Sequence, residues 1–325
     1  MRRAKLLLLL LISVALILTL AGCRAAATGD SIRARVGTWK TAQTIQPFFY
    51  QQFLPEGDGV EIAPFTNPGD MKTALLAGSL DMCGTTLVTA ITAVSKGEPI
   101  VVVAGMSNRC SALVVHKDAG INSVKDLAGK KIAYVPGTMH HLLLLETLDR
   151  HGLDWQEDVE LIRVDFFDMA QALAQGTVDA FYSGEPYPSV AVAQGFGKIL
   201  AYPEDDFGVI NSAMITTKDK IAREPELVQK LVTAHVRATE YLLTHREAWL
   251  HKAAEFGTDP GVLMVSAGNI DLFWQIDERY MEGVRVLAQR MWEQGIITEI
   301  PDIESMFDLR FLTGAAKEIG HEKER

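Results

Sequence analysis

The sequence predicts an α/β protein made of two similar lobes, between which the chain crosses twice. Three observations predict this fold class: β-rich runs alternate with helical periodicity, residues 70–81 are echoed by residues 168–179, and amphipathic helices follow the echo. The 325 residues are 48% hydrophobic and 22% charged, as in packed globular proteins. This composition excludes disorder as the main state, and the length suits about two domains.

The N-terminus has the pattern of an export signal. Arg2, Arg3 and Lys5 precede an apolar run from Leu6 to Leu20, which is shorter than the about 20 residues of a spanning helix. Ala21-Gly22 before Cys23 resembles the lipobox of bacterial lipoproteins. We therefore expect a signal peptide over 1–22, a lipidated Cys23 and a tether over 23–30, with an uncleaved anchor helix as the alternative.

Charge narrows the possible partners. The formal net charge is −10, and removing the three cations of the signal makes it −13, which argues against nucleic acid as a partner. No later apolar segment approaches membrane-spanning length. We expect an extracytoplasmic body held at the bacterial membrane through Cys23.

The first lobe begins with alternating elements. The pattern predicts strands over 34–37, 60–65 and 79–84, separated by helices over about 45–53 and 69–77. A βαβαβ order predicts a parallel sheet with helices on both faces.

The echo predicts that this unit is used twice. Asp, Met, Ala, Leu, Gly and Asp recur in register between residues 70–81 and 168–179. Asp70 and Asp168 are candidate N-caps, and Gly78 and Gly176 can take the left-handed turn that ends a helix. Residues 131–135 would correspond to 35–39 as the opening strand of each unit.

The last third of the chain returns to the first lobe. It opens with a strand-like run over 209–216, and apolar residues then follow helical spacing over 228–243 and 284–292. We expect residues 31–109 with 208–325 to form lobe 1 and residues 110–207 to form lobe 2. Crossings near Arg109–Ser111 and Phe207–Asn211 would act as a hinge.

Several short motifs, in this order, carry a family resemblance. They are the lipobox, Ala74-Leu75-Leu76-Ala77-Gly78-Ser79-Leu80-Asp81-Met82, Gly84-Thr85-Thr86, Val124-Lys125-Asp126-Leu127-Ala128-Gly129-Lys130-Lys131-Ile132-Ala133, Gly137-Thr138, Val178-Asp179-Ala180-Phe181 and Glu185-Pro186-Tyr187. The chain resembles solute-binding proteins of ABC importers, in the group serving nitrate, sulfonate, taurine and thiamine-pyrimidine uptake. The resemblance implies a type II periplasmic binding protein fold, no catalysis and no cofactor. It also implies delivery of a small molecule to a permease and its ATPase.

Candidate ligand residues lie where strands end and helices begin, because helix N-termini there present free N–H groups. They are Trp39, Lys40, Thr85, Thr86, Arg109, Gly137, Thr138, His140, Glu185 and Tyr187. Lys40, Arg109 and His140 favour an anionic ligand, whereas Trp39, Tyr187 and Glu185 favour a flat nitrogenous one. Glu185 could also pair with Lys40 or Arg109 across the hinge. Each has a plain structural alternative, such as core packing for Trp39.

Cys83 and Cys110 are the cysteines left after Cys23. An oxidising compartment invites a disulfide between them. We expect two structural cysteines, bridged or free, in preference to a metal site.

The sequence thus predicts a binding protein and not an enzyme. His-Glu-x-x-His, Gly-x-Ser-x-Gly, the phosphate-binding loop and Cys-x-x-Cys are all absent from the sequence. The alternatives are an enzyme like the pyrimidine synthases that share this fold, and a sensing lobe for a signalling partner.

Overall fold

The computed structural model describes residues 33–203 and 210–323. The expected signal peptide, Cys23 and the tether lie outside these residues. Among the described helices, none combines the length and apolar character needed to cross a membrane.

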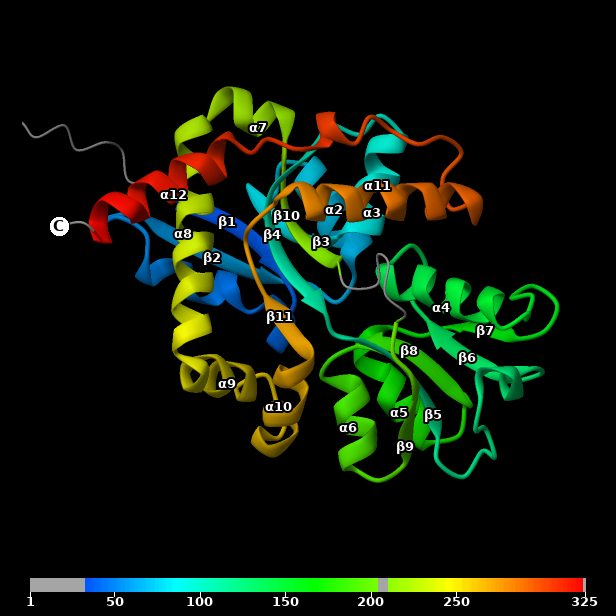
Figure 1. The fold of residues 1–325 in the computed structure, drawn as a ribbon. Helices are drawn as coiled ribbons and strands as arrows, with labels where there is room; N and C mark the ends of the chain where they lie inside the picture. Colours follow the sequence, from blue (N-terminus) through cyan, green and yellow to red (C-terminus); the bar gives the residue numbers. More distant parts are fainter. Residues whose placement is uncertain (1–32, 204–209, 324–325) are drawn as a thin grey trace, which may run out of the picture. The chain divides into compact units, whose positions relative to one another are not determined.

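Two mixed sheets form the framework (Figure 1). The first has the order β11-β4-β10-β3-β1-β2, with bounds Ile270–Leu272, Ile100–Arg109, Ile210–Thr217, Met82–Thr86, Arg33–Thr38 and Gly59–Pro64. The second has the order β7-β6-β8-β5-β9, with bounds Glu160–Arg163, Lys131–Tyr134, Ala180–Gly184, Ser111–His116 and Gly197–Ala201.

The expected repeat is present in both sheets. β1 lies between parallel neighbours β2 and β3, and β6 lies between parallel neighbours β7 and β8. The repeated aspartates do the same work: Asp81 Oδ2 accepts from the Arg35 amide at 2.7 Å, and Asp179 Oδ2 accepts from the Lys131 amide at 2.8 Å. Each carboxylate fastens the start of one strand to its neighbour.

The parallel pairing predicted for the βαβαβ unit is confirmed in β1, β2 and β3, but each sheet also contains antiparallel strands that the pattern did not predict. β10 runs antiparallel to β3 and β4, and β5 runs antiparallel to β8 and β9. The reason is topological. β4 carries the chain out of the first sheet and β10 carries it back, so two adjacent crossing strands must point in opposite directions.

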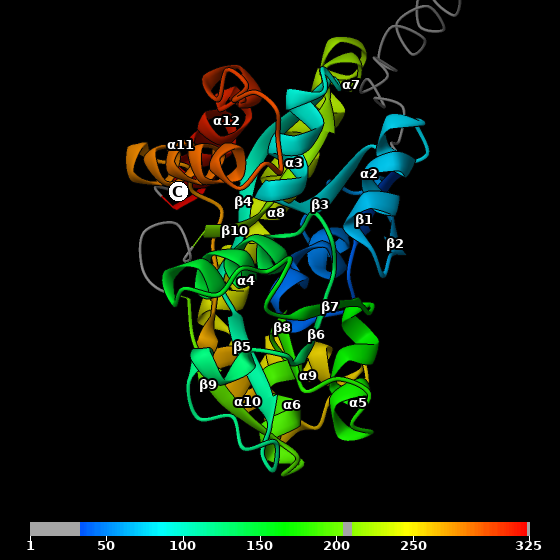
Figure 2. The same ribbon diagram turned by 90° about the vertical axis from the view of Figure 1, so that its right-hand side faces the viewer.

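Helices cover both faces of the second sheet (Figure 2). Leu113, Val115 and Tyr182 belong to the same apolar cluster as helix α4 (Met139–Arg150), whereas Val114 and Phe181 pack with α5 (Met169–Ala174) and α6 (Tyr187–Ala193). Alternate residues of one strand thus face opposite sides, as strand geometry requires.

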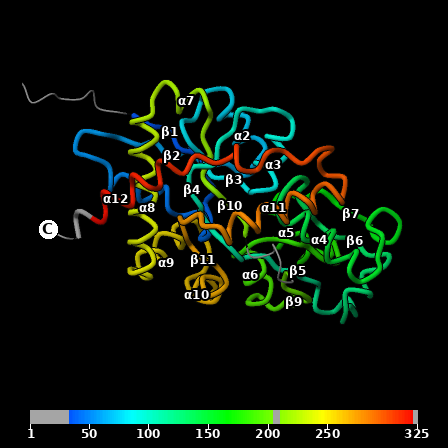
Figure 3. The backbone as a smooth tube through the Cα atoms, turned by 45° about the horizontal axis from the view of Figure 1, so that its top comes forward, coloured from blue at the N-terminus to red at the C-terminus, as the bar shows by residue number. Residues whose placement is uncertain are grey.

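Most of the remaining helices lie around the first sheet. Their bounds are Pro68–Leu76 (α2), Leu87–Ser95 (α3), Lys218–Arg223 (α7), Pro225–Thr244 (α8), Arg246–Ala254 (α9), Pro260–Ser266 (α10), Glu278–Glu293 (α11) and Arg310–Lys323 (α12). α8 lies beside α12 (Figure 3) and also contacts β4, and α11 packs on α3 and β10. α8, α11 and α12 thus contact strands of the first sheet, whereas α10 contacts α6 beside the second sheet.

Short 3-10 turns complete the chain. They span Ala42–Thr44 (η1), Gln46–Gln52 (η2), Val124–Leu127 (η3), Phe166–Asp168 (η4), Ala267–Asn269 (η5) and Glu304–Met306 (η6). The helix expected over 45–53 is thus 3-10, and its backbone closes tight bonds such as Phe48 N–H to the Ile45 carbonyl at 3.0 Å. Gln46 is tied to the Met106 carbonyl at 2.6 Å, so tertiary contacts set this geometry.

The caps of the repeated helices were predicted in part. Gly78 and Gly176 have φ of +75° and +68°, the left-handed conformation expected of them. Asp70 was the wrong N-cap, because Asn67 precedes Pro68 and its side chain accepts from the Gly69 and Asp70 amides. Asp168 is the N-cap of α5, but its side chain makes no capping bond.

Candidate functional site

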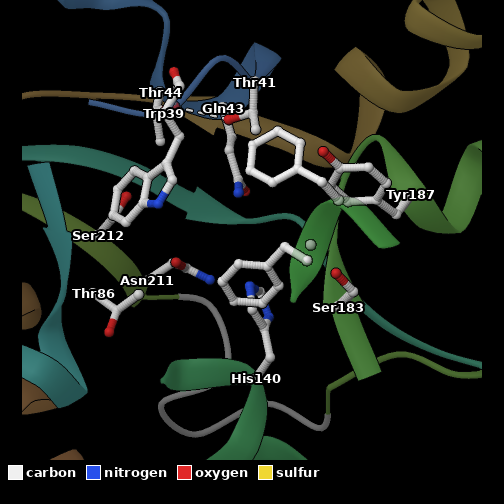
Figure 4. A pocket seen from close by; sticks show the side chains of 13 residues that line it. Trp39, Thr41, Gln43, Thr44, Thr86, His140, Ser183, Tyr187, Asn211 and Ser212 are labelled. Atoms are coloured by element: carbon white, nitrogen blue, oxygen red, sulfur yellow. Dashed lines mark hydrogen bonds between the residues drawn. The ribbon is translucent and has the colours of Figure 1, made fainter. Parts of the chain in front are cut away.

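A pocket lies between the two sheets and takes side chains from both (Figure 4). Trp39, Thr41, Gln43, Thr44, Thr86, Asn211 and Ser212 come from the first sheet and its turns, and His140, Phe166, Phe167, Ser183, Gly184 and Tyr187 come from the second half. Its free volume is about 30 Å³. Only a small molecule or a small head group fits without the walls moving.

The turn after β1 positions one wall. Trp39 follows the last residue of β1 and is 6% exposed. The Thr44 hydroxyl donates to the Trp39 carbonyl at 3.0 Å, and the Thr38 hydroxyl donates to the Thr44 carbonyl at 2.8 Å. These bonds fold the turn back on itself and bring Gln43 into the pocket. The indole Nε1 of Trp39 is buried and has no hydrogen-bond partner in residues 33–203 and 210–323.

The opposite wall depends on a glycine. A Cβ at Gly184 would lie 3.0 Å from His140 Cε1 and 3.1 Å from both terminal atoms of the Gln43 amide. The strand β8 can therefore approach these two side chains only because residue 184 has no side chain. Ser183, next to it, is fully buried, and its hydroxyl also has no partner within the described part of the chain.

His140 is a neutral polar group at the base of the pocket. Its Nδ1 is 3.0 Å from the Ser111 hydroxyl, and its ring meets Phe166 edge to face at 5.3 Å between centroids. Burial lowers the pKa of His140 from 6.5 to about 3. The imidazole is therefore uncharged at neutral pH and supplies no positive charge to an anion.

Four predicted residues reach the pocket and six do not. Trp39, Thr86, His140 and Tyr187 line it, and Tyr187 meets Phe167 edge to face at 5.8 Å. Lys40 is exposed, and Thr85 is buried outside the lining. Gly137 forms the left-handed turn before α4, with φ of +69°, and Thr138 caps that helix.

Arg109 and Glu185 also lie away from this pocket. Arg109 is about half exposed and faces Asp271 at 3.6 Å. Glu185 is 2% exposed, and its Oε1 accepts from Asn269 Nδ2 at 2.7 Å and from the Ser189 hydroxyl at 2.9 Å. Burial raises the pKa of Glu185. Glu185 does not form the ion pair with Lys40 or Arg109 that the sequence left open, because the neutral donors Asn269 and Ser189 hold its carboxylate.

The sequence left open whether Cys83 and Cys110 form a disulfide or stay free. In the structure, both cysteines are free, buried thiols. Burial raises the pKa of Cys83 and of Cys110, so both stay protonated and unreactive. Within the described residues, no group of three or more His, Cys, Asp or Glu side chains is placed to hold a metal ion.

The predicted set of ligand residues left out most of the pocket's polar wall: Thr41, Gln43, Thr44, Ser183, Asn211 and Ser212. One signal was available. Asn211 and Ser212 are polar residues within the strand-like run 209–216, and a polar pair inside a buried strand needs partners. Ser212 finds one in the Ser107 hydroxyl at 2.6 Å.

Comparison with known proteins decides the family. The signature of the family described as "NMT1/THI5 like" matches residues 53–248, which is more than half of the chain. The chain belongs to this family. An Escherichia coli (strain K12) protein named "Putative aliphatic sulfonates-binding protein" is 33% identical over 132 residues, covering 40% of this chain and 41% of that protein.

A second relative has an enzyme's name. The 4-amino-5-hydroxymethyl-2-methylpyrimidine phosphate synthase of Schizosaccharomyces pombe is 29% identical over 146 residues, covering 43% of this chain and 41% of that enzyme. The chain therefore spans less than half of the length of each of these two relatives.

A solved structure establishes the fold. The alkanesulfonate-binding protein SsuA from Xanthomonas axonopodis pv. citri bound to MOPS superposes with a TM-score of 0.77 at 20% identity, covering 87% of this chain and 100% of that one. The predicted two-lobed type II binding-protein fold is confirmed, and so is the predicted family resemblance.

Proposed function

We propose that this NMT1/THI5-like protein binds a small solute outside the cytoplasm and presents it to the permease and ATPase of an ABC importer. The observation that carries the proposal is the pocket between the two sheets, where buried polar atoms of Trp39, Gln43 and Ser183 have no hydrogen-bond partner among the described residues. The sulfonate-binding name of the E. coli relative supports the same role.

We propose further that residues 31–109 with 208–325, and residues 110–207, move as two lobes. Among the described residues, side-chain hydrogen bonds that join the two parts include Asn269 Nδ2 to Glu185 Oε1 at 2.7 Å, the Thr89 hydroxyl to the Gly137 carbonyl at 3.1 Å, Gln294 Nε2 to Glu146 Oε1 at 3.1 Å and Asn211 Nδ2 to Ser111 Oγ at 3.4 Å. Arg109 and Cys110, at the first crossing, have φ of 59° and 72°. Non-glycine residues in this region store strain, which suits a hinge.

Small-angle scattering and calorimetry together test this function. Native mass spectrometry of protein purified without added solute would first identify any retained molecule. Its removal should enlarge the radius of gyration and its return should reduce it, because binding favours the closed state. A solute that binds with no change in radius would contradict lobe closure.

We also propose that Cys23 anchors the protein to the membrane through lipid. The lipobox-like Leu20-Ala21-Gly22-Cys23 supports this. Cys23→Ser should move the protein from the membrane fraction to the soluble fraction, while the matched control Cys83→Ser stays at the membrane. If the Cys23→Ser protein stays in the membrane fraction, the proposed lipid anchor at Cys23 is contradicted.

The synthase relative favours a second candidate, an enzyme that acts on a bound cofactor with His140 or His141, of which His140 lines the pocket. Pure protein mixed with pyridoxal phosphate separates the two candidates. The binding-protein proposal expects an unchanged absorbance spectrum, and a spectral shift that disappears in His140→Asn would favour the enzyme.

A further inference from the structure

The lining of the pocket is uncharged. Of the thirteen residues that line it, none is Lys, Arg, Asp or Glu, and His140 is neutral because burial lowers its pKa to about 3. A buried ion without an opposite charge loses far more solvation energy than a neutral polar group does. The pocket is therefore chemically suited to a neutral head group.

The buried polar atoms without a hydrogen-bond partner also indicate which donors and acceptors a ligand needs. The Trp39 indole N–H can only donate, whereas the Gln43 carboxamide offers one acceptor and two donors. The Ser183 hydroxyl can do either. Trp39 Nε1, Gln43 Oε1 and Ser183 Oγ are all buried without a partner in the part of the chain that the structure describes. Trp39 is 6% exposed and Ser183 is fully buried, so solvent does not satisfy them.

Other hydroxyls of the pocket are already engaged. Thr41 and Thr44 bond to each other at 2.8 Å, Thr86 bonds to Thr89 at 2.9 Å, and Ser212 bonds to Ser107 at 2.6 Å. The hydrogen-bonding groups that remain available to a ligand are therefore those of Trp39, Gln43 and Ser183. Figure 4 shows Trp39 and Tyr187 on opposite sides of the space, with His140 below.

We infer that the pocket takes an uncharged head group that presents a hydrogen-bond donor beside an acceptor, as a carboxamide does. The acceptor of the ligand meets the Trp39 N–H, and its donor meets the Gln43 carbonyl. Phe166, Phe167 and Tyr187 add aromatic surface to the same lining, against which the apolar part of a ligand can pack. This inference rests on the proposed function and names its ligand class.

A sulfonate fits this wall poorly. Its oxygens only accept, so the Gln43 carbonyl would stay unsatisfied beside a negative charge, or the amide would have to turn over. Lys40 is exposed outside the pocket lining, and Arg109 faces Asp271. Neither supplies a countercharge.

Matched ligand pairs test the inference by titration calorimetry on the full chain. Acetamide is compared with methanesulfonate, and benzamide with benzenesulfonate, so that only the head group changes within a pair. We expect at least one amide to bind, and to bind at least tenfold more tightly than its sulfonate. A sulfonate that binds as tightly as its amide overturns the inference, and so does the absence of binding by both amides.

Matched variants test whether the amide binds at Trp39 and Ser183. Trp39→Phe keeps the ring and removes the N–H, and Ser183→Ala removes the hydroxyl. Each should weaken amide binding about fivefold, the scale of one hydrogen bond. Trp292→Phe, at a half-exposed indole, is the control and should leave the affinity unchanged. Unchanged affinity in both pocket variants, with melting temperatures near that of the wild type, overturns the inference.

The two proposals fail in different ways. If a sulfonate binds tightly and the scattering radius shrinks, the binding function stands and the ligand class falls. If no solute retained from the cell or added from a broad collection changes the radius, the binding function itself falls.

Discussion

Gly184→Ala is the sharpest single test of the pocket's geometry. The added Cβ would lie 3.0 Å from His140 Cε1 and 3.1 Å from the Gln43 amide, where ordinary carbon contacts are about 3.5–4.0 Å. Each neighbour must therefore recede by roughly half an ångström. His140 is 3% exposed and held by Ser111, so it cannot recede freely.

The two effects of Gly184→Ala differ in size. Overpacking costs about 1–3 kcal/mol, and the stiffer unfolded chain offsets about 0.4–1 kcal/mol of it, so the free energy of unfolding should fall by about 1 kcal/mol. Solute affinity should fall at least tenfold, or about 1.4 kcal/mol, because both Gln43 and His140 are displaced.

Urea unfolding and calorimetry with the retained solute, or with benzamide, measure the two effects. Gly268→Ala is the control: its Cβ would meet nothing within 4 Å, and the residue is exposed. A Gly184→Ala protein that binds solute as tightly as the wild type would refute the assignment of this pocket as the binding site.

Three further predictions concern buried polar groups. His140 and His235 have pKa values lowered by burial from 6.5 to about 3 and about 4. The unfolded chain takes up their protons first as pH falls, so each should remove about 2 kcal/mol from the free energy of unfolding between pH 7 and pH 5; a flat urea-unfolding profile would contradict this. Glu185→Ala leaves the buried Asn269 amide unpaired and should lower the free energy of unfolding by at least about 1 kcal/mol, while solute affinity stays within threefold. Equal stability of the two proteins, or a large affinity loss, would show that Glu185 acts otherwise. Trp249→Phe removes the 2.7 Å bond to the Ala42 carbonyl and should cost about 1 kcal/mol in urea unfolding, with Trp292→Phe as a neutral control.

Local patterning was enough to predict the repeated framework. Apolar alternation and the recurring glycines identify β1, β2 and β3 and their counterparts, since burial of one face and left-handed helix ends are written in nearby residues. The direction of β10 could not be predicted this way. It depends on which distant strand it joins, and β4 is about a hundred residues earlier in the chain.

Only those residues of the pocket lining that lie at strand ends could be predicted from the sequence. Trp39, Thr86 and Tyr187 were found because they follow strands whose carboxyl ends meet at the pocket. Gln43 lies in a 3-10 turn whose shape is set by bonds from Thr38 and Thr44, and Ser183 lies inside a strand. Neither position differs in sequence from an ordinary surface or core residue.

The same contrast explains why ligand charge could not be inferred from residue types. Lys40 and Arg109 suggested an anion because they sit at the right places along the chain, but long cationic side chains turn toward water wherever the backbone lets them. The groups left inside are short and neutral, and the cost of burying them falls only when a ligand completes their hydrogen bonds. In such a pocket, the unsatisfied atoms of the wall are a better guide to the ligand than the charges near it.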